Sequence, residues 1–500
     1  MPQEKLSQLR ARLGEVSDIH SAASLLQWDM ETYMPPKAAP ARGEQIATLS
    51  ALAHRAFTAP EMGALLHDLR QTVEQLSEDD AKLVEIALYD YERAVKLPEA
   101  FVHEFSLEQS AAFQAWLKAR VEKKFALFQS RLEKLWQLLR RKADLLGYEG
   151  SPYNALLEDY ERGMTAEKLK VLFGVLASCQ RDLIRRIVHS SRQPDVSWTV
   201  GEWNEKTQWD FSLGVLKDMG FDFEAGRQDK SVHPFTTNFD ICDVRITTRI
   251  DERNLFSALA SSIHEGGHAL YEQGFRLEDR RTPLAQAISL GVHESQSRLW
   301  ENMIGKSLAF WKHYAPMLRD RYPERLAALT PEQVYAAVNQ VRPSLIRVEA
   351  DECTYNLHII LRFEIEAGLM EGTLKVCDIP QVWNEKMRDY LGLNPPDDAA
   401  GCLQDIHWSH GLVGYFPTYA LGNLYAAQIF EKIMQDIPDL WTQIETGCFG
   451  GLLGWLRDNV HKHGRRLTAP QLIEKITGNE PDCEPYLRYL ENKFSSLYGL

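Results

Sequence analysis

LFSALASSIHEGGHALYEQG, residues 255–274, is the stretch from which the centre of this chain can be interpreted. We interpret it as a helix, on which His264 and His268 are four residues apart and project from one face. Glu265 directly follows the first histidine. This H-E-x-x-H pattern suits a tetrahedral metal: two neutral imidazoles bind it, a third ligand comes from elsewhere, and the open position holds a water that the glutamate can deprotonate.

The surroundings of the motif predict that this helix is buried. Its flanking residues are apolar or small, and buried histidines need partners, which argues against two solvated histidines on a surface helix. Gly266 and Gly267 each cost ~1 kcal/mol relative to alanine inside a helix. We therefore expect another backbone, or a substrate, to approach closely at the two glycines.

A third metal ligand is expected on the next helical segment, QAISLGVHESQSRLWEN (286–302). Glu294 lies 26 residues after His268, a separation that lets a second helix fold back across the first. Spacing alone leaves His293, Glu301 and Glu272 open as alternatives.

The segment just before the motif helix differs from the rest of the chain. FTTNFDICDVRITTRI (235–250) has β-branched residues at roughly alternate positions, which predicts a short hairpin or small sheet. Pro234 precedes it, and we expect Asp251 to start the following helix.

Helical periodicity dominates the remaining sequence. Residues 82–96 show apolar spacing of i, i+3, i+4 and i+7, and 101–146 continues for many turns without Pro or Gly. Thr165 is a predicted helix cap. Later helices are interrupted near Pro343, Pro395–Pro396 and Pro417. The expected architecture is mainly α, with one small β element.

Composition excludes several classes of protein. The chain has 500 residues, 56 basic and 70 acidic, with a net charge of −14 and 44% hydrophobic residues. These values exclude disordered and collagen-like proteins and argue against a nucleic-acid partner. No apolar run predicts a membrane span, and the start lacks the apolar core of a signal peptide. Seven scattered cysteines without C-x-x-C spacing indicate neither a disulfide framework nor a cysteine zinc site, so we expect a cytoplasmic protein.

Six motifs follow one another along the chain. They are His233-Pro234-Phe235, Asp243-Val-Arg245-Ile-Thr247, His264–His268, His293-Glu294-Ser295-Gln296, Ile346-Arg347-Val-Glu-Ala350-Asp351 and Gly401-Cys-Leu-Gln404-Asp405-Ile-His407-Trp408. With these motifs in this order, the sequence resembles the Taq-type (thermostable) metallocarboxypeptidases over essentially its full length.

The resemblance has implications beyond those of spacing. It implies that Glu294 is the third zinc ligand, and that residues 1–500 form a single catalytic domain of two helical halves around a deep cleft, saddle-shaped like neurolysin and angiotensin-converting enzyme. It implies release of C-terminal amino acids one at a time from peptides, with broad specificity but not for proline. It also implies a homodimer.

Other residues have expected roles in this hydrolysis. Glu265 takes a proton from the metal-bound water that attacks the scissile carbonyl and passes it to the leaving amine. The oxyanion needs a further donor, for which we favour Tyr419 with His410, and Tyr415 is nearby. The alternative for each is an ordinary core aromatic.

An exopeptidase must also bind a free carboxylate, and the forked guanidinium of arginine fits one. The candidates are Arg347 and Arg245, with Gln404 and His233 as polar neighbours. The alternative for each arginine is a structural ion pair with an aspartate of its own motif, Asp351 for Arg347 and Asp243 for Arg245. For the carboxylates that orient the two histidines, the candidates are Asp405, Asp351 and Glu301.

Two other functions compete with this interpretation. An oligoendopeptidase or a dipeptidyl carboxypeptidase would use the same chemistry on a related fold and differ in its products. A silent helical scaffold would hold a structural metal, although such a site usually closes with a fourth protein ligand. Zn²⁺ is the expected cofactor, and Co²⁺ or Mn²⁺ can occupy such sites.

Overall fold

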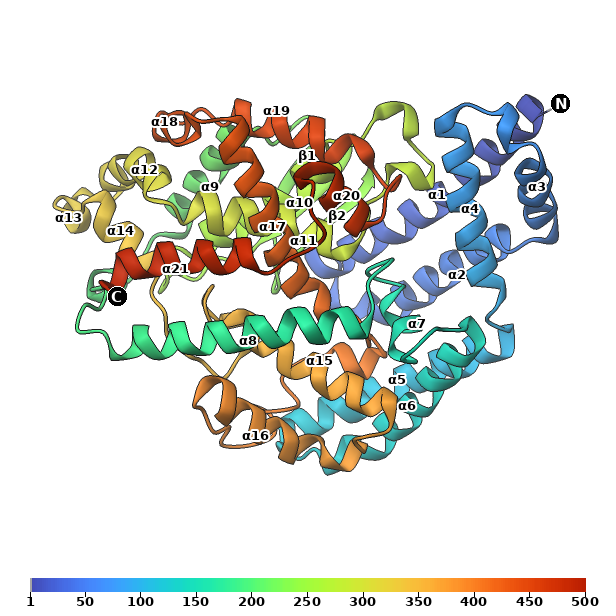
Figure 1. Ribbon diagram of the computed structural model, residues 1–500, viewed down its shortest axis with the longest axis horizontal. Helices are drawn as coiled ribbons and strands as arrows, with labels where there is room; N and C mark the ends of the chain where they lie inside the picture. Colours follow the sequence, from blue (N-terminus) through green and yellow to red (C-terminus); the bar gives the residue numbers. More distant parts are fainter. Residues whose placement is uncertain (1) are drawn as a thin grey trace.

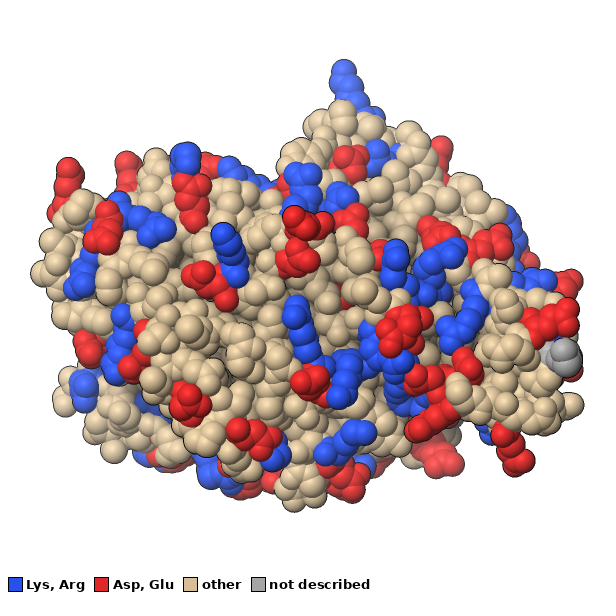
Figure 2. Space-filling view, turned by 90° about the horizontal axis from the view of Figure 1, so that it is seen from above, with Lys and Arg blue, Asp and Glu red and all other residues tan. Residues whose placement is uncertain are grey.

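The structure is a computed structural model that describes residues 2–500, and it is mainly helical with one small sheet near its centre (Figure 1). This confirms the mainly α class with one small β element. In the described part of the chain, no helix is long and apolar enough to cross a membrane. Acidic and basic side chains are interspersed over the face shown in Figure 2.

The first helices have a small hydrophobic core of their own, separate from the main core. Leu9, Leu66 and Leu83 are fully buried in it, and Leu284 from a much later loop completes it. The N-terminal helices are α1 (Pro2–Thr32), α2 (Ala39–Phe57), α3 (Pro60–Gln71) and α4 (Glu78–Val95). The organisation of residues 1–500 as a single domain stays a prediction.

The remaining helices share the large core (Figure 1). Before the sheet they are α5 (Glu99–Glu122), α6 (Ala126–Leu146), α7 (Tyr153–Leu157), α8 (Ala166–His189) and α9 (Glu205–Met219). After it come α10 (Ser257–Glu272), α11 (Leu290–Arg298), η6 (Leu299–Gly305), α12 (Leu308–Arg321), α13 (Pro323–Leu326), α14 (Pro331–Val338), α15 (Tyr355–Glu371) and α16 (Ile379–Leu391). The last are α17 (Pro417–Asp436), α18 (Leu440–Glu445), α19 (Gly450–Asn459), α20 (Ala469–Thr477) and α21 (Glu484–Tyr498).

Residues 101–146 do not form the uninterrupted helix that their periodicity predicts. Lys123 has a φ of 59°, the left-handed conformation that ends helices, and its N–H bonds to the carbonyls of Ala119 and Arg120. The chain turns back there, and Asp398 accepts a hydrogen bond from the Phe125 N–H (2.8 Å). A lysine is a weak signal for this conformation, so local sequence did not reveal the turn. The Thr165 cap is confirmed by its bond from the Lys168 N–H (3.3 Å).

The sheet contains the predicted hairpin and one strand more. Strands β2 (Thr236–Asp240) and β3 (Asp243–Thr248) are antiparallel, as expected, and β1 (Gly226–Lys230) pairs with β3 in parallel, giving the order β1-β3-β2. The charged sequence of β1 lacks the apolar alternation by which strands are recognised. Asp251 does not start the next helix, because its carboxylate accepts from the Arg253 N–H in a turn (2.9 Å), and α10 begins at Ser257.

Packing around α10 positions the candidate site. This helix contacts α9, α11 and the sheet, and α11 packs extensively on α17. The H-E-x-x-H helix is buried, as predicted. A Cβ atom on Gly267 would lie 2.7 Å from the Gln296 carbonyl oxygen and from the Ser297 Cα on α11. The glycine therefore permits the close backbone approach that the sequence predicted.

Candidate metal centre and active site

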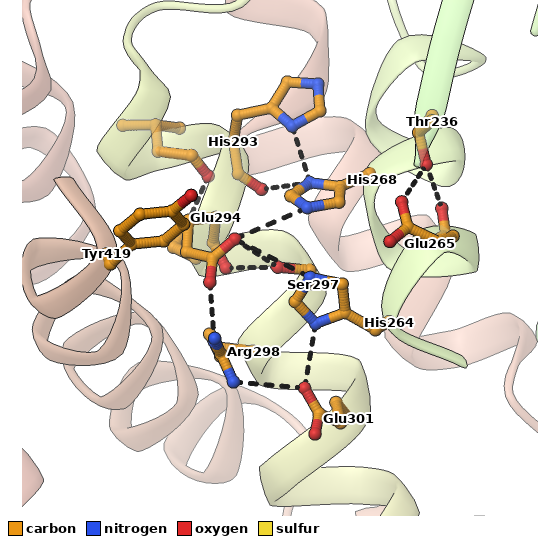
Figure 3. A network of polar contacts seen from close by, with 12 residues as sticks. Thr236, His264, Glu265, His268, His293, Glu294, Ser297, Arg298, Glu301 and Tyr419 are labelled. Carbon is orange, nitrogen blue, oxygen red and sulfur yellow. Dashed lines mark hydrogen bonds and ion pairs between the residues drawn. The ribbon is translucent and has the colours of Figure 1, made fainter. Parts of the chain in front are cut away.

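Three side chains from α10 and α11 converge on one point (Figure 3). One ligand atom from each of His264, His268 and Glu294 lies within 4.8 Å of the others. Glu294 Oε2 is 3.8 Å from His264 Nε2 and 3.4 Å from His268 Nε2. Two imidazoles and one carboxylate at this spacing form a donor set suited to a divalent metal with an open coordination position.

The outer nitrogen of each histidine already has a partner. His264 Nδ1 lies 2.8 Å from Glu301 Oε2, and His268 Nδ1 lies 3.0 Å from the carbonyl oxygen of His293. With Nδ1 donating, Nε2 is the nitrogen left to bind a metal. Glu301 is thus the orienting carboxylate for His264, whereas Asp351 and Asp405 make their contacts elsewhere.

The alternatives for the third ligand support the site from behind. The ring of His293 lies 2.6 Å from His268, Nδ1 to Nδ1, and its Nε2 is 2.7 Å from Glu272 Oε1. Glu272 also accepts from the Asn238 side chain on β2. Glu272, His293 and His268 therefore form a chain of contacts that ends at His268 Nδ1. Neither His293 nor Glu272 belongs to the group of ligand atoms formed by His264, His268 and Glu294.

Arg298 holds the carboxylate of Glu294. Its Nε donates to Glu294 Oε1 (2.6 Å), its NH1 donates to Glu301 Oε2 (3.3 Å), and its guanidinium stacks over Tyr355. Burial alone would raise the pKa of Glu294, but Arg298 and His264 hold it well below its usual range. Burial, reinforced by His293, lowers the pKa of His268 to about 3. The ligands are therefore an ionised carboxylate and, at His268, a neutral imidazole.

Glu265 lies beside this set and is held by the sheet (Figure 3). Thr236 on β2 donates to Glu265 Oε2 (2.6 Å). Burial raises the pKa of the Glu265 carboxyl, which His264 and the Thr236 hydrogen bond partly offset. A carboxylate with a raised pKa next to a metal site is suited to accept a proton from water.

Arg347 is 6% exposed and belongs to a buried cluster. Its Nε and NH2 donate to Asp405 (3.0 and 2.9 Å), and its NH1 donates to Tyr355 (3.1 Å). Arg362 binds the second oxygen of Asp405 (2.7 Å). The structural partner of Arg347 is thus Asp405 and not Asp351, and the guanidinium retains two N–H groups that these bonds do not use.

The polar neighbours and the second candidate arginine are placed differently. Gln404 accepts from the Arg347 backbone N–H (2.9 Å) and donates to the Leu345 carbonyl (3.1 Å), so it braces the cluster. Arg245 forms the two-bond pair with Asp243 (2.8 and 2.9 Å) that the motif allowed. The side chain of His233 is exposed.

Tyr419 meets His407, and not His410 as the sequence suggested. The Tyr419 hydroxyl is 3.5 Å from His407 Nε2, and the ring of Tyr415 packs against Tyr419. His410 instead stacks on Phe113 of α5. His407 belongs to the last of the six motifs, which is the only feature of the sequence that could have indicated it. Spacing along the chain does not show whether His407 or His410 faces α17, the helix that follows.

Figure 3 places Tyr419 next to Glu294, so its hydroxyl lies on the border of the candidate metal site. Tyr419 also packs against the Arg347 guanidinium, 5.0 Å from its ring centroid. The structure thereby joins the Arg347 cluster to the metal ligands. Lys306 donates to Glu301 Oε1 (3.0 Å) and so helps to hold this carboxylate. Sequence reasoning missed the three supporting residues Arg298, Thr236 and Lys306, because none has a spacing that marks it.

Comparison with known proteins agrees with this geometry. Residues 8–494 match the family described as Carboxypeptidase Taq (M32) metallopeptidase. The chain is 41% identical over 496 residues to thermostable carboxypeptidase 1 of Thermus thermophilus, covering 97% of each chain. It is 39% identical to carboxypeptidase 1 of Bacillus subtilis, covering 98% of this chain and 97% of the relative. The solved M32 carboxypeptidase of Deinococcus radiodurans superposes with a TM-score of 0.97 at 40% identity, covering 99% of this chain and all of the other.

Proposed function

Because the chain belongs to the carboxypeptidase Taq (M32) family and is a metallocarboxypeptidase, we propose that it uses Zn²⁺ to release C-terminal amino acids from peptides. Release proceeds one residue at a time, with broad specificity but not for proline. The observation that carries the proposal is the convergence of His264, His268 and Glu294 next to Glu265.

The donor set fits Zn²⁺. Both imidazoles present Nε2, their Nδ1 atoms being occupied, and Glu294 is ionised. A bound divalent ion supplies Lewis acidity to the scissile carbonyl and lowers the pKa of water at the open position. The same donors accept Co²⁺ or Mn²⁺.

Glu265 acts as the general base in this proposal. Its Oε2 is held by Thr236, which fixes the side chain at the edge of β2. The carboxylate takes the proton of the attacking water and returns it to the departing amine, and its raised pKa suits both transfers.

Tyr419 is the proposed donor to the developing oxyanion. Its hydroxyl borders the metal ligands and lies 3.5 Å from His407 Nε2. Burial lowers the pKa of His407 to about 3, so this ring is neutral. With its proton on Nε2 the ring donates to the Tyr419 hydroxyl oxygen, which leaves the single O–H of Tyr419 for the oxyanion. A preorganised donor at this position stabilises charge that develops in the transition state. Tyr415 packs against the ring of Tyr419. His410 stacks on Phe113 and has no role in this proposal.

Arg347 is the proposed site for the substrate carboxylate. Asp405 and Tyr355 hold the guanidinium rigidly, and two N–H groups remain for a ligand. Arg347→Ala should raise KM strongly and leave the zinc content intact. Equal loss of zinc would instead indicate a structural role.

Assembly and location remain proposals. We expect a homodimer in the cytoplasm that acts on peptides and does not bind nucleic acid. Sedimentation of the purified protein at several concentrations tests the dimer, because a single monomer mass throughout would reject it.

A single peptide experiment tests the main proposal. A ten-residue peptide, with its C-terminus free or amidated, is incubated with the enzyme with and without a chelator and followed by mass spectrometry. The expected result is a ladder of single-residue losses from the free peptide, which is absent on the amide and with chelator. Internal cleavage of both peptides would show an endopeptidase, loss of dipeptides a dipeptidyl carboxypeptidase, and no cleavage after zinc addition a silent scaffold.

A further inference from the structure

A cavity of about 380 Å³ lies where α12, α14, α18 and α21 meet the π-helical segment η6. Its apolar lining comes from Met303, Leu308, Ala309, Tyr335, Trp441 and Tyr489. None of these residues belongs to the active site described above. A volume in this range is typical of pockets that bind small molecules.

The polar groups of this pocket are mainly donors. Lys306, Lys312 and Lys493 line it, whereas Glu445 is the one carboxylate among its lining residues. An ammonium group has three N–H donors. Lys493 uses all three, on Glu352, the Asn302 carbonyl and Tyr489.

The other two lysines have donors to spare among the described contacts. Lys306 bonds to Glu301 (3.0 Å) and Asn302 (2.8 Å), which leaves one N–H. Lys312 bonds to Glu445 (2.7 Å), which leaves two. The Tyr335 hydroxyl bonds to none of the described residues. Spare donors beside an apolar wall suit a ligand with an acceptor-only anionic end and an apolar body.

A hydrogen-bond chain connects this pocket to the metal ligands. Lys306 Nζ donates to Glu301 Oε1, and Glu301 Oε2 is 2.8 Å from His264 Nδ1. Glu301 lies in η6, and π-helices are rare and occur frequently at functional sites. One turn of this segment thus carries both the carboxylate that orients His264 and, at Met303, part of the pocket wall.

We propose that this pocket is a regulatory site for a small carboxylate with an apolar body, whose binding to Lys306 and Lys312 strengthens metal retention through Glu301 and His264. The ligand binds the spare N–H of Lys306 and, as a second counter-ion, weakens the bond of this ammonium to Glu301. Glu301 then becomes a stronger acceptor for the His264 N–H, and the imidazole becomes a better ligand. The coupling rests on the metal site proposed above, whereas binding of the carboxylate does not.

Calorimetry with 3-phenylpropionate tests the binding step, with 3-phenylpropanamide as the neutral control. We expect the acid to bind and the amide to bind at least tenfold more weakly, because the amide lacks the charge that makes these hydrogen bonds strong. Lys312→Ala should weaken binding of the acid about tenfold, and Leu308→Trp should abolish it by filling the cavity. Lys432→Ala, which removes a lysine paired with Asp436 on exposed α17 surface, is the matched control and should bind normally.

The acid also resembles the product of the proposed reaction, so the variants identify its site. Binding in the active site would persist in both pocket variants, and unchanged affinity in both would overturn the proposal. Thermal unfolding of each variant shows that a loss of binding is not a loss of fold.

Zinc release into excess chelator tests the coupling. Saturating 3-phenylpropionate should slow release roughly threefold in the wild type, a fraction of the tenfold or more that such orienting partners control. It should leave the release rate of Leu308→Trp, which cannot bind the acid, unchanged. By linkage, the acid should bind tighter to the zinc-loaded than to the zinc-free protein by the ratio of the two zinc affinities. An unchanged release rate with the pocket filled would refute the coupling. A wild type that holds no zinc would refute the proposed function instead, while the calorimetry on zinc-free protein would still decide whether the pocket binds.

Discussion

Replacing Glu301 by glutamine tests how much of the metal affinity depends on a residue that does not touch the metal. Glu301 accepts from His264 Nδ1 at 2.8 Å and also contacts Arg298 and Lys306. Glutamine keeps the shape and an acceptor oxygen but removes the charge. The two cations then lie near the ligands without their common counter-ion.

The expected loss follows from these contacts. A hydrogen bond to a charged acceptor contributes about 1 kcal/mol more than one to a neutral acceptor, which is roughly a fivefold change in affinity. Loss of the negative charge next to two cations adds to this. We therefore expect zinc affinity to fall between about tenfold and 100-fold, the range found for partners that orient metal-binding histidines.

Competition with a chromophoric chelator measures the affinity, and kcat at saturating zinc measures the consequence. Because Glu301 does not contact the substrate in our proposal, kcat should fall by less than about tenfold. Glu364→Gln is the matched control, since Glu364 also accepts from a lysine, Lys386 (2.6 Å), but lies outside the site. Zinc affinity in Glu301→Gln equal to that of the control would refute the role of Glu301 in holding His264.

Three further substitutions test other parts of the structure. Glu265→Gln should keep its zinc, measured by metal analysis, and lose several orders of magnitude in kcat; substantial remaining turnover would exclude Glu265 as the base. Gly267→Ala should lower the free energy of unfolding, measured in urea titrations, by about 1–3 kcal/mol, because the new Cβ would lie 2.7 Å from the backbone of α11. Gly454→Ala is the control and should not destabilise the protein, because no atom lies within 4 Å of the position of its Cβ. Glu161 accepts a hydrogen bond from the Gly291 N–H at the start of α11, and burial raises the pKa of its carboxyl to about 7. Above about pH 4.3 the native state therefore binds more protons than the unfolded state, and the free energy of unfolding falls as pH rises to 7. In zinc-free protein, Glu161→Gln should reduce the decline between pH 5 and 8 by about 3 kcal/mol; an identical decline would show that Glu161 is ionised throughout.

Local patterns were sufficient for the parts of this protein that depend on neighbours in sequence. Three features were predicted from residues that are close along the chain. They are the helical spacing, the hairpin at 235–250, and the pair His264 and His268 on one helix face. The cost of the glycine pair inside a helix also predicted a close contact. At Gly267 the neighbour is the backbone of α11, as expected, whereas at Gly266 it is the side chain of Leu216. Strand β1 and the turn at Lys123 were missed, since a charged edge strand and a lysine in a left-handed conformation have no distinctive local signal.

Contacts between distant segments decided the rest of the site. Three glutamates were nearly equivalent in sequence as candidates for the third ligand. Only the packing of α10 on α11 separates Glu294, which converges with His264 and His268, from Glu301 and Glu272, which contact the outer nitrogens of histidines. The pairing of Arg347 with Asp405 and of Tyr419 with His407 likewise depends on where a late loop folds onto earlier helices. The sequence determined which chemical groups the protein has, through motifs whose periodicity is local. Tertiary structure determined which of those groups meet, because a hydrogen bond depends on the distance between atoms and not on their separation along the chain.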